Sequence, residues 1–349
     1  GRAAKRLSEL CGCNATTIHS LLRWDLESNT FLVNEKEPLQ CDLLIIDEFS
    51  MVDQWLFYNL LKASKLVKKI LIIGDEDQLP SVGCGSVLKD LIACEQFAVT
   101  RLHKIFRQSE GSDVIALAHE IREEQITVLD YAKDIAFFDA QNYEVRDLVV
   151  RIVANALEKG YESKDIQVLA PKYGGVAGID ALNNALQKMM NPSTAHKREL
   201  KVGYRIFRVG DKVLQLKNQP EDEVYNGDIG EIVDIAYASE SVGQKHQLLV
   251  DFDGIMVEYS NEQLYNITHA FCISIHKAQG SEYPIVILPI VSEYAYMMSK
   301  RLLYTAVTRA KKSLVLLGER DMLHKAVTRK ERHQRNSTLE MRIRKLFHA

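Results

Sequence analysis

The sequence predicts an α/β protein with two parallel sheets, each covered by helices on both faces, and a small β-barrel inserted in the second α/β domain. Five short apolar runs predict buried parallel strands, because they are apolar on both faces and lead into helix-like segments. Residues 204–265 instead combine short strands with Asn-Gly and Asp-Gly turns and show almost no helical periodicity, which is typical of an antiparallel barrel. The α/β pattern resumes at Phe271, so the barrel is predicted to be an insertion.

The predicted strands fall into an early group and a late group, which is why two sheets are predicted. They lie at residues 43–46, 70–73, 167–170, 284–288 and 314–317. A short β-hairpin is predicted at about 24–40, where polar turn residues flank an apolar stretch. The predicted domains are 1–125 with the hairpin, 126–203 together with 266–349, and the inserted barrel at 204–265.

Composition places the chain among ordinary globular proteins of two or three domains, with 349 residues, 46% hydrophobic and 26% charged. No apolar run approaches the roughly 20 residues that a membrane helix needs, and the N-terminus has no apolar signal core. A cytoplasmic protein without membrane contact is therefore expected. Six scattered cysteines, with a lone C-x-C at 11 and 13, predict reduced, mostly buried thiols and not a zinc site.

The net charge of −3 is unevenly distributed. Residues 300–349 contain 14 Lys and Arg and 4 Asp and Glu, a local charge of +10, so the preceding residues carry −13. This asymmetry permits a surface that follows nucleic-acid phosphates, and a solvated helical face explains it equally well.

Polar residues follow both strands of the early group. In open α/β sheets ligands bind at the carboxyl ends of strands. Asp47 there can hold Mg²⁺, and Glu48 can orient and deprotonate a water molecule. After the second strand, Gln78 can sense a γ-phosphate by hydrogen bonding. The alternatives are an ordinary surface turn at 47–48 and a polar loop that Pro80 ends.

Two arginines are candidates for stabilising charge on a transferring phosphoryl group. Arg107 and Arg309 each stand in a largely apolar stretch, where an unpaired guanidinium is costly. A structural salt bridge is the alternative for each. The segment 274–282 adds His276, Lys277 and Gly280, which can hold phosphates or bases close to the backbone, unless it is simply a solvated loop.

In their order along the chain, these segments resemble the motifs of superfamily-one helicases. Residues 1–7 resemble motif Ia, 16–19 the DNA-contacting segment that follows it, 47–48 motif II, 74–78 motif III, 106–108 motif IV, 274–282 motif V and 304–310 motif VI. The RecD-like helicases of the short bacterial type are the nearest resemblance, because residues 168–183 match their pattern. Residues 208–215 with 226–231 resemble their SH3-like insertion. The resemblance covers nearly the whole chain.

The resemblance implies two RecA-like, P-loop NTPase-type domains with the nucleotide site between them, an SH3-like barrel, and a strand-separating pin at 24–40. It implies an ATP-dependent DNA helicase or translocase that moves 5′ to 3′ on single-stranded DNA in DNA repair or recombination. ATP and Mg²⁺ are the implied cofactors. The implied partners are single-stranded DNA and duplex junctions, with a single-strand-binding protein or nuclease-complex subunits as further candidates, in a bacterial cytoplasm near the nucleoid.

The resemblance also implies roles for single residues. Those implied in ATP hydrolysis are Asp47 as the magnesium ligand, Glu48, Gln78, Arg107 and Arg309 as catalytic residues, and Gly280 and Glu282 in the nucleotide cleft. Those implied in DNA contact are Arg2, Thr17, His19, Lys172, His276 and Lys277.

The sequence departs from the family in one respect. The phosphate-binding loop G-x-x-x-x-G-K-[ST] does not occur in these 349 residues. In the family that loop precedes motif Ia, so the chain is expected to start after it and to hydrolyse ATP negligibly by itself. A non-catalytic DNA-binding or scaffolding subunit is therefore the alternative function. A nuclease is disfavoured, because no carboxylate cluster beyond Asp47–Glu48 suits two-metal cleavage.

The hairpin at 24–40 allows two interpretations. Trp24, Phe31 and Val33 are either an apolar wedge at a duplex junction or part of the core of the first domain.

Overall fold

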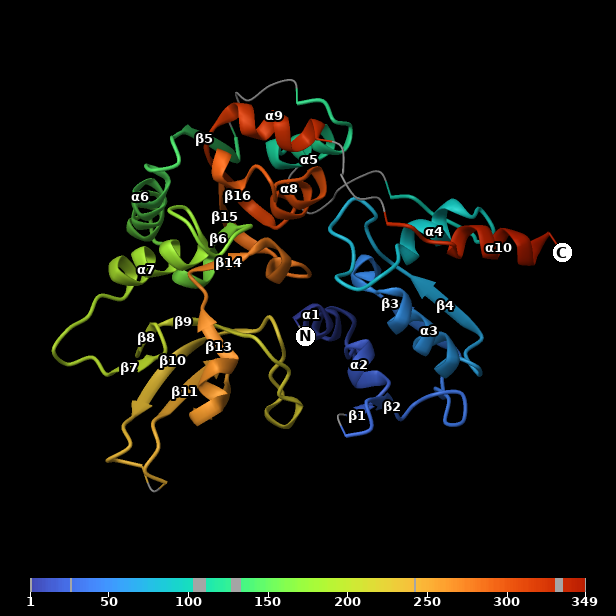
Figure 1. Ribbon diagram of the computed structural model, residues 1–349, viewed down its shortest axis with the longest axis horizontal. Helices are drawn as coiled ribbons and strands as arrows, with labels where there is room; N and C mark the ends of the chain where they lie inside the picture. The colour runs from blue at the N-terminus through green and yellow to red at the C-terminus, as the bar shows by residue number, and fades with distance from the viewer. Residues whose placement is uncertain are drawn as a thin grey trace. The chain divides into compact units, whose positions relative to one another are not determined.

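The computed structural model describes residues 2–25, 27–102, 111–126, 133–241, 243–329 and 335–348. The chain divides into two compact units (Figure 1). Unit 1 comprises Gly1–Arg2 and Arg107–Arg329, and unit 2 comprises Ala3–Phe106 and Lys330–Ala349. This division differs from the predicted domain limits in two places. Residues 111–125, which contain the helix Asp113–Arg122, group with unit 1 although the first domain was predicted to run to 125. Residues 335–348 group with unit 2 although the second domain was predicted to run to 349.

Unit 2 contains a two-stranded parallel sheet with helices and a hairpin. Its elements are α1 (Arg2–Cys11), α2 (Ile18–Leu21), β1 (Trp24–Asp25), β2 (Thr30–Phe31), β3 (Leu43–Ile46), η1 (Phe49–Met51), α3 (Gln54–Ala63), β4 (Lys69–Ile72), α4 (Val87–Ala93) and α10 (Leu339–Phe347). β3 and β4 pair in parallel from Leu43↔Lys69 to Ile46↔Ile72, and β1 pairs with β2 as an antiparallel hairpin. The predicted strands and hairpin of this region are confirmed.

The β3–β4 sheet buries only one of its faces. Alternate side chains pack in the core of unit 2, namely Leu44, Ile46, Ile70 and Ile72. The side chains between them are 44–49% exposed, namely Leu43, Ile45, Leu71 and Ile73. The prediction that strands apolar on both faces are buried on both is therefore wrong for this pair. The physical reason for the difference is that the core of unit 2, among the described residues, packs against only one face of this sheet.

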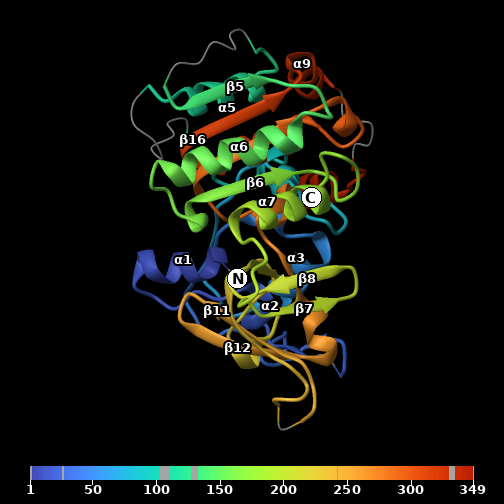
Figure 2. The ribbon, with the colours of Figure 1, turned by 90° about the vertical axis from the view of Figure 1, so that its left-hand side faces the viewer.

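Unit 1 contains a five-stranded sheet in which every pairing is parallel, with the order β14-β6-β15-β16-β5. Its strands are β5 (Ile135–Asp139), β6 (Ile166–Ala170), β14 (Cys272–Ser274), β15 (Tyr283–Ile290) and β16 (Ala310–Gly318). Figures 1 and 2 show α6 (Val145–Glu158) and α7 (Ile179–Met190) on one face. α5 (Asp113–Arg122), α8 (Lys300–Val307) and α9 (Arg320–Thr328) lie on the other. The late predicted strands lie within β6, β15 and β16, so the second α/β sheet is confirmed.

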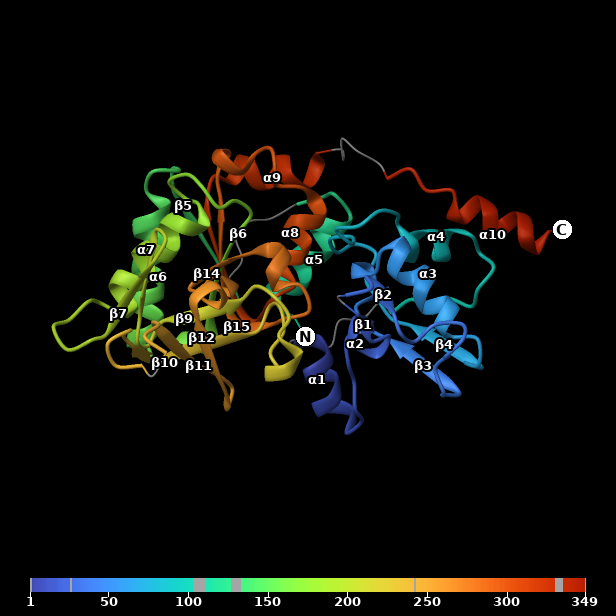
Figure 3. The same cartoon turned by 60° about the horizontal axis from the view of Figure 1, so that its bottom comes forward.

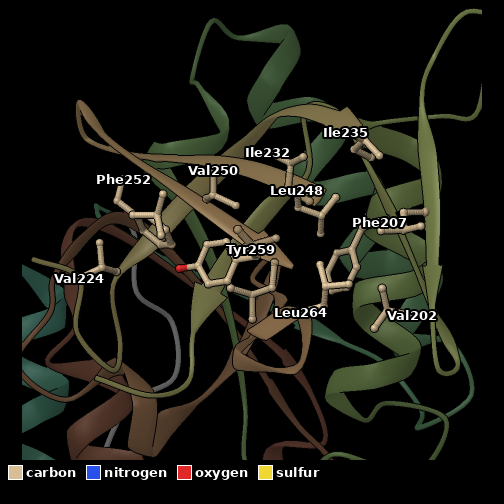
Figure 4. Packing of buried hydrophobic residues seen from close by; sticks show 14 residues of the cluster. Val202, Phe207, Val224, Ile232, Ile235, Leu248, Val250, Phe252, Tyr259 and Leu264 are labelled. Carbon is tan, nitrogen blue, oxygen red and sulfur yellow. The ribbon is translucent and has the colours of Figure 1, made fainter. Parts of the chain in front are cut away.

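The insertion in unit 1 is an antiparallel sheet with the order β12-β11-β10-β9-β13. Its strands are β9 (Lys212–Gln215), β10 (Ile229–Ala236), β11 (Gln247–Phe252), β12 (Ile255–Ser260) and β13 (Ile267–His269), and a separate hairpin, β7 (Glu199–Val202) with β8 (Arg205–Arg208), precedes it. Alternate residues of β11 point into an apolar core, which Figure 4 shows around Phe207, Leu248 and Tyr259. β10 adds Ile232 and Ile235, which lie on either side of a register shift. Tyr259 donates its buried hydroxyl to Gln215 Oε1 over 2.8 Å, which satisfies the polar end of the ring.

The carboxylate of Asp211 joins the insertion to α7. Asp211 is 0% exposed, and its Oδ2 accepts from the backbone N–H of Arg208 at 2.7 Å and from Gln187 Nε2 at 2.6 Å. Its Oδ1 accepts from Asn191 Nδ2 at 2.8 Å, and His269 Nε2 lies 3.2 Å from Oδ2. A buried carboxylate is stable only when donors satisfy it, so this residue fixes β9 and β13 against the end of α7.

Four of the six cysteines are exposed, which corrects the expectation of mostly buried thiols. Cys11 and Cys13 lie at the end of α1, and Cys41 and Cys84 lie in loops, where a thiol has no apolar core to enter. All six are free, and Cys94 and Cys272 are buried. Among the residues that the structure describes, no helix combines the length and the apolar character that crossing a membrane requires.

We predict that Asp211→Ala lowers the free energy of unfolding by about 3 kcal/mol, because it leaves several buried donors without their acceptor. Chemical denaturation followed by circular dichroism measures this change. Asp234→Ala is the matched control, because Asp234 is exposed on β10, and it should change stability by about 0.5 kcal/mol or less. Equal stability of the two variants would show that the Asp211 network is dispensable.

Candidate functional site

Asp47 and Glu48 stand where β3 ends, at the carboxyl edge of the unit 2 sheet. Asp47 is exposed, and its Oδ1 accepts from the backbone N–H of Glu48 at 2.8 Å. Glu48 has φ 51° and ψ 40°, the left-handed region that costs a non-glycine residue energy. The chain therefore turns sharply after the strand, and this turn separates the two carboxylates from the core residue Phe49.

The end of β4 approaches this turn closely because residue 74 is glycine. A Cβ on Gly74 would lie 3.2 Å from the backbone nitrogens of Phe49 and Ser50 and 2.9 Å from Leu88 Cδ2. The backbone also joins the two strand ends, since Phe49 N–H donates to Ile73 O over 3.0 Å. The segments predicted as motifs II and III therefore lie side by side.

Gln78 is held in this region by Asp75. Its side chain is buried, with the residue 5% exposed, and Gln78 Nε2 donates to Asp75 Oδ2 over 3.2 Å. In the described part of the chain, its Oε1 has no hydrogen-bond partner, and neither has the buried Oγ of Ser50. Buried polar atoms without partners are rare in folded proteins, so a ligand or water at this point is chemically expected.

These residues fit a magnesium–nucleotide complex. Within the described residues, no group of three or more His, Cys, Asp or Glu side chains is placed to hold a metal ion. Mg²⁺ does not need such a group, because it is commonly bound by one or two carboxylates, water and substrate phosphates. The exposed carboxylate of Asp47 is a ligand of that kind, and Gln78 Oε1 and Ser50 Oγ offer polar atoms nearby in the fold.

Two of the predicted DNA contacts in unit 2 lie at the start of α2. Thr17 caps the helix, and its Oγ1 accepts from Ser20 N–H over 3.2 Å. Partial burial lowers the pKa of His19, and the carboxylate of Asp53 opposes the shift. The lowered pKa favours the neutral imidazole, which contacts nucleic acid by hydrogen bonding or stacking. Arg2 begins α1, and its side chain lies outside the described residues.

The hairpin residues pack onto unit 2. Phe31 is 6% exposed, and its ring lies 4.8 Å from Trp24, 5.3 Å from Trp55 and 5.8 Å from His19, centroid to centroid. Trp24 and Val33 are partly buried against the same core. These contacts agree with the packing interpretation of the three side chains. The strand-separating role of the hairpin stays a prediction.

In unit 1, His276 and Lys277 follow β14 in the short helix η5 (Ile275–Ala278). Ser274 caps this helix and fixes its start, since its Oγ accepts from Lys277 N–H. Burial lowers the pKa of both side chains. Lys277 Nζ donates to Asn226 Oδ1 over 2.5 Å, so this side chain contacts a loop of the insertion. Asn226 is an uncharged amide, so the contact is a hydrogen bond and not an ion pair. Asn226 belongs to the segment 226–231 that resembles the SH3-like insertion and was not among the predicted site residues.

Arg309 and Glu282 are both buried near the start of β16. Arg309 is 1% exposed, and its guanidinium donates to Thr305 O and Ser281 O at 3.1 Å each. The Glu282 side chain is 5% exposed, with Lys311 Nζ 3.7 Å from its Oε2. Gly280 adopts φ +71°, the left-handed conformation that favours glycine, in the turn before them. Arg309 thus fastens the end of α8 to this turn.

Lys172 contacts the carboxylate of Glu293, which lies 121 residues further along the chain and was not among the predicted site residues. Its Nζ lies 3.1 Å from Glu293 Oε1, while Glu293 Oε2 accepts from Asn142 Nδ2 over 2.9 Å. Burial alone would raise the pKa of Glu293, but the hydrogen bonds from Asn142 and Lys172 and the Lys172 charge bring it below its usual value. A Cβ on Gly175 would come within 1.5 Å of Glu293 Oε1, so the loop can enclose the carboxylate only with glycine there.

The structure thus brings together Asp47, Glu48 and Gln78 in unit 2, and Gly280, Glu282 and Arg309 in unit 1. Arg107 lies outside the described residues. The roles predicted for all of these residues, and for the DNA contacts, stay predictions.

Three family profiles match the chain in separate segments. An AAA domain matches residues 1–84, the SH3 domain of ATP-dependent RecD-like DNA helicases matches 182–252, and a UvrD-like helicase C-terminal domain matches 269–317. The second of these overlaps the antiparallel insertion, which is therefore SH3-like, and the other two overlap the parallel sheets.

Curated relatives match nearly the whole chain. The ATP-dependent RecD2 DNA helicase of Deinococcus radiodurans is 33% identical over 345 residues, which are 99% of this chain and 45% of that protein. The RecBCD enzyme subunit RecD of Mycolicibacterium smegmatis is 27% identical in an alignment of 361 positions, gaps included, which covers 94% of this chain and 62% of that protein. The chain therefore spans about half of the length of the curated relatives it matches.

Solved structures share the fold. The Pif1 helicase of Candida albicans matches with a TM-score of 0.55 and 18% identity, covering 99% of this chain and 87% of that one. A Bacteroides Pif1 helicase in complex with ADP-AlF3 and single-stranded DNA matches with a TM-score of 0.53 and 17% identity, covering 98% and 85%. The solved structures show the fold alone, whereas the SH3-domain profile and the RecD2 relative make the chain similar to RecD-like DNA helicases along nearly its whole length.

Proposed function

We propose that this chain forms the motor of an ATP-dependent DNA helicase or translocase, which moves 5′ to 3′ on single-stranded DNA in repair or recombination. The observation that carries the proposal is the pairing of two polar strand ends in unit 2. Gly74 brings the Asp75–Gln78 segment against the turn that presents Asp47 and Glu48. Such a pairing supports the proposed roles of Asp47 as metal ligand, Glu48 as general base and Gln78 as phosphate sensor, because ligands bind at the carboxyl ends of strands in open α/β sheets.

Each of these residues has a distinct task in the proposal. When bound, the magnesium–nucleotide complex supplies the phosphoryl group and neutralises its charge. Asp47 holds the metal through its exposed carboxylate. Glu48 orients a water molecule and accepts its proton, and the left-handed backbone keeps this carboxylate at the rim of the sheet. Gln78 offers Oε1 to the water or a phosphate group and so reports the nucleotide state.

Unit 1 is proposed to supply the remaining nucleotide contacts. Arg309 neutralises developing charge on the γ-phosphate, which requires its guanidinium to exchange at least one of its present contacts for a phosphate oxygen. Gly280 and Glu282 line the nucleotide site, where Lys311 Nζ lies 3.7 Å from Glu282 Oε2.

Single-stranded DNA is proposed to contact Lys277 and His276 in unit 1 and Thr17 and His19 in unit 2. The partner of Lys277 Nζ is the uncharged amide of Asn226, so a DNA phosphate can displace that amide and bind the lysine. Lys172 is a weaker candidate, because its ammonium already pairs with Glu293. The solved Bacteroides relative with single-stranded DNA supports this class of partner.

A non-catalytic subunit of a larger complex is the second candidate. Relatives described as RecBCD enzyme subunit RecD favour assembly into a multi-subunit enzyme. The two candidates differ in whether Glu48 is needed for ATP turnover.

We predict that Glu48→Gln in the intact protein lowers DNA-stimulated ATP turnover by about 10³-fold or more, because the water loses its base. Nucleotide affinity and DNA affinity should stay within about twofold, since the amide keeps the shape of the side chain. Steady-state ATPase and equilibrium binding measure both quantities.

Asp42→Asn is the matched control, because Asp42 precedes the opposite end of β3 and pairs with Lys68 on the surface. It should leave turnover unchanged. A wild-type protein that does not turn over ATP, or a Glu48→Gln variant as active as the wild type, would favour the non-catalytic subunit.

We predict that Lys277→Ala weakens single-stranded DNA binding, because one ammonium no longer contacts a phosphate. The slope of the logarithm of the DNA association constant against the logarithm of the salt concentration should become shallower by about 1. Basal ATPase without DNA should be preserved. Fluorescence anisotropy at several salt concentrations measures the slope. Lys312→Ala is the matched control, because Lys312 is an exposed lysine on β16 and its removal changes the charge by the same amount. An equal effect of both variants would show that Lys277 makes no specific contact with DNA.

A further inference from the structure

The C-terminal arm, defined as residues 335–348, is built into unit 2. Its helix α10 lies beside α4, as Figures 1 and 3 show. Leu339 packs against the core of unit 2, Arg344 donates to Ala93 O over 2.5 Å, and the Phe347 ring meets Phe97 edge-on at 5.9 Å. The arm is therefore anchored along its length to α4 and the residues that follow it.

Arg335, the first described residue of the arm, binds the Ser81–Gly85 loop. One guanidinium nitrogen donates to Gly83 O over 2.7 Å, to Gly85 O over 2.8 Å and to Ser81 Oγ over 3.2 Å. The other donates to Ser81 O. One planar fork thus joins three carbonyls of a five-residue loop, a geometry that arginine provides and lysine does not.

The loop is seated against the start of α3 on its other side. A Cβ on Gly83 would lie 2.0 Å from Asp53 Oδ2, and one on Gly85, which has φ +92°, would lie 2.9 Å from Gln54 Cβ. Gln54 N–H also donates to Cys84 O over 3.0 Å. The loop is therefore held between the start of α3 and the Arg335 guanidinium.

The loop follows Gln78 after only Leu79 and Pro80. The Gln78 side chain is buried, is held by Asp75 and keeps Oε1 without a partner among the described residues. A displaced loop would move Gln78, since a proline-containing link of two residues has little freedom to absorb the shift. We propose that Arg335 is a positioning residue for Gln78, so that the C-terminal arm sets the geometry of the phosphate-sensing segment. This inference rests on the proposed function.

The test combines a structural and a kinetic measurement on the intact protein. Cys84 is exposed within the loop and serves as a probe when Cys11, Cys13, Cys41 and any other reactive cysteine are replaced by serine. In Arg335→Ala, thiol labelling of Cys84 should accelerate by about 10-fold or more, because the loop loses several charge-assisted hydrogen bonds. The DNA-stimulated kcat should fall by about 10-fold with KM for ATP unchanged, because Gln78 is misplaced but the nucleotide still binds.

Two further variants separate positioning from a general effect of the arm. Arg342→Ala removes the same charge from an exposed position of α10 and should change neither quantity. Arg335→Lys keeps the charge but not the fork and should give intermediate changes in both, which also tests the idea if Arg335→Ala does not fold.

The outcomes are decisive. Faster labelling with a lower kcat in the Arg335 variants alone supports the proposal. Unchanged labelling, faster labelling with an unchanged kcat, a lower kcat without faster labelling, or an equal effect of Arg342→Ala each overturns it. A wild-type protein without DNA-stimulated turnover refutes the proposed function instead, and labelling then still reports whether Arg335 holds the loop.

Discussion

The buried carboxylate of Asp211 accepts hydrogen bonds from several elements of unit 1, and these bonds hold the elements together. A carboxylate with no exposure is unstable unless it is hydrogen-bonded. Gln187 and Asn191 reach it from the end of α7, and His269 reaches it from β13. Because these donors come from both the parallel sheet layer and the insertion, satisfying Asp211 fixes the SH3-like sheet on α7. The contact between Lys277 and Asn226 depends on that orientation.

A second constraint is that the parallel strands of each sheet deliver the polar residues that follow them to the carboxyl edge of that sheet. Asp47 and Glu48 follow β3, Gln78 follows β4, and His276 and Lys277 follow β14. The turn at Glu48 adopts a left-handed conformation, which a non-glycine residue occupies only where the surrounding structure holds it. Strain of this kind at a strand end is consistent with a site that is set in place before its ligand arrives.

The strands and the insertion were predictable because their signals are local. Residues 43–46 and 314–317 are apolar runs of strand length, and the Asn-Gly and Asp-Gly turns mark antiparallel pairs wherever they occur. The exposed face of the β3–β4 sheet was not predictable. An apolar run shows that both faces of a strand could be buried, but it does not show which other elements cover each face. The inward packing of Phe31 was open for the same reason.

The candidate site was predictable only in part. Motif order predicted Asp47 and Gln78 as site residues. The contacts of Lys172 with Glu293 and of Arg335 with the Ser81–Gly85 loop, by contrast, join residues more than a hundred positions apart. No spacing in the sequence encodes such pairs, because they depend on how the elements pack. The burial of Arg309 was also not predictable from the sequence. A guanidinium in an apolar stretch can bind either a ligand or backbone carbonyls, and in the structure it binds backbone carbonyls.

Translocation along single-stranded DNA is the central claim, and its most direct measurement is stopped-flow kinetics on oligonucleotides of increasing length with a fluorophore at one end. The intact protein should show an ATP-dependent lag before the signal that grows in proportion to the oligonucleotide length, and only when the fluorophore is at the 3′ end. A lag that is independent of length, or a signal that needs no ATP, would contradict the assignment of this chain as a motor.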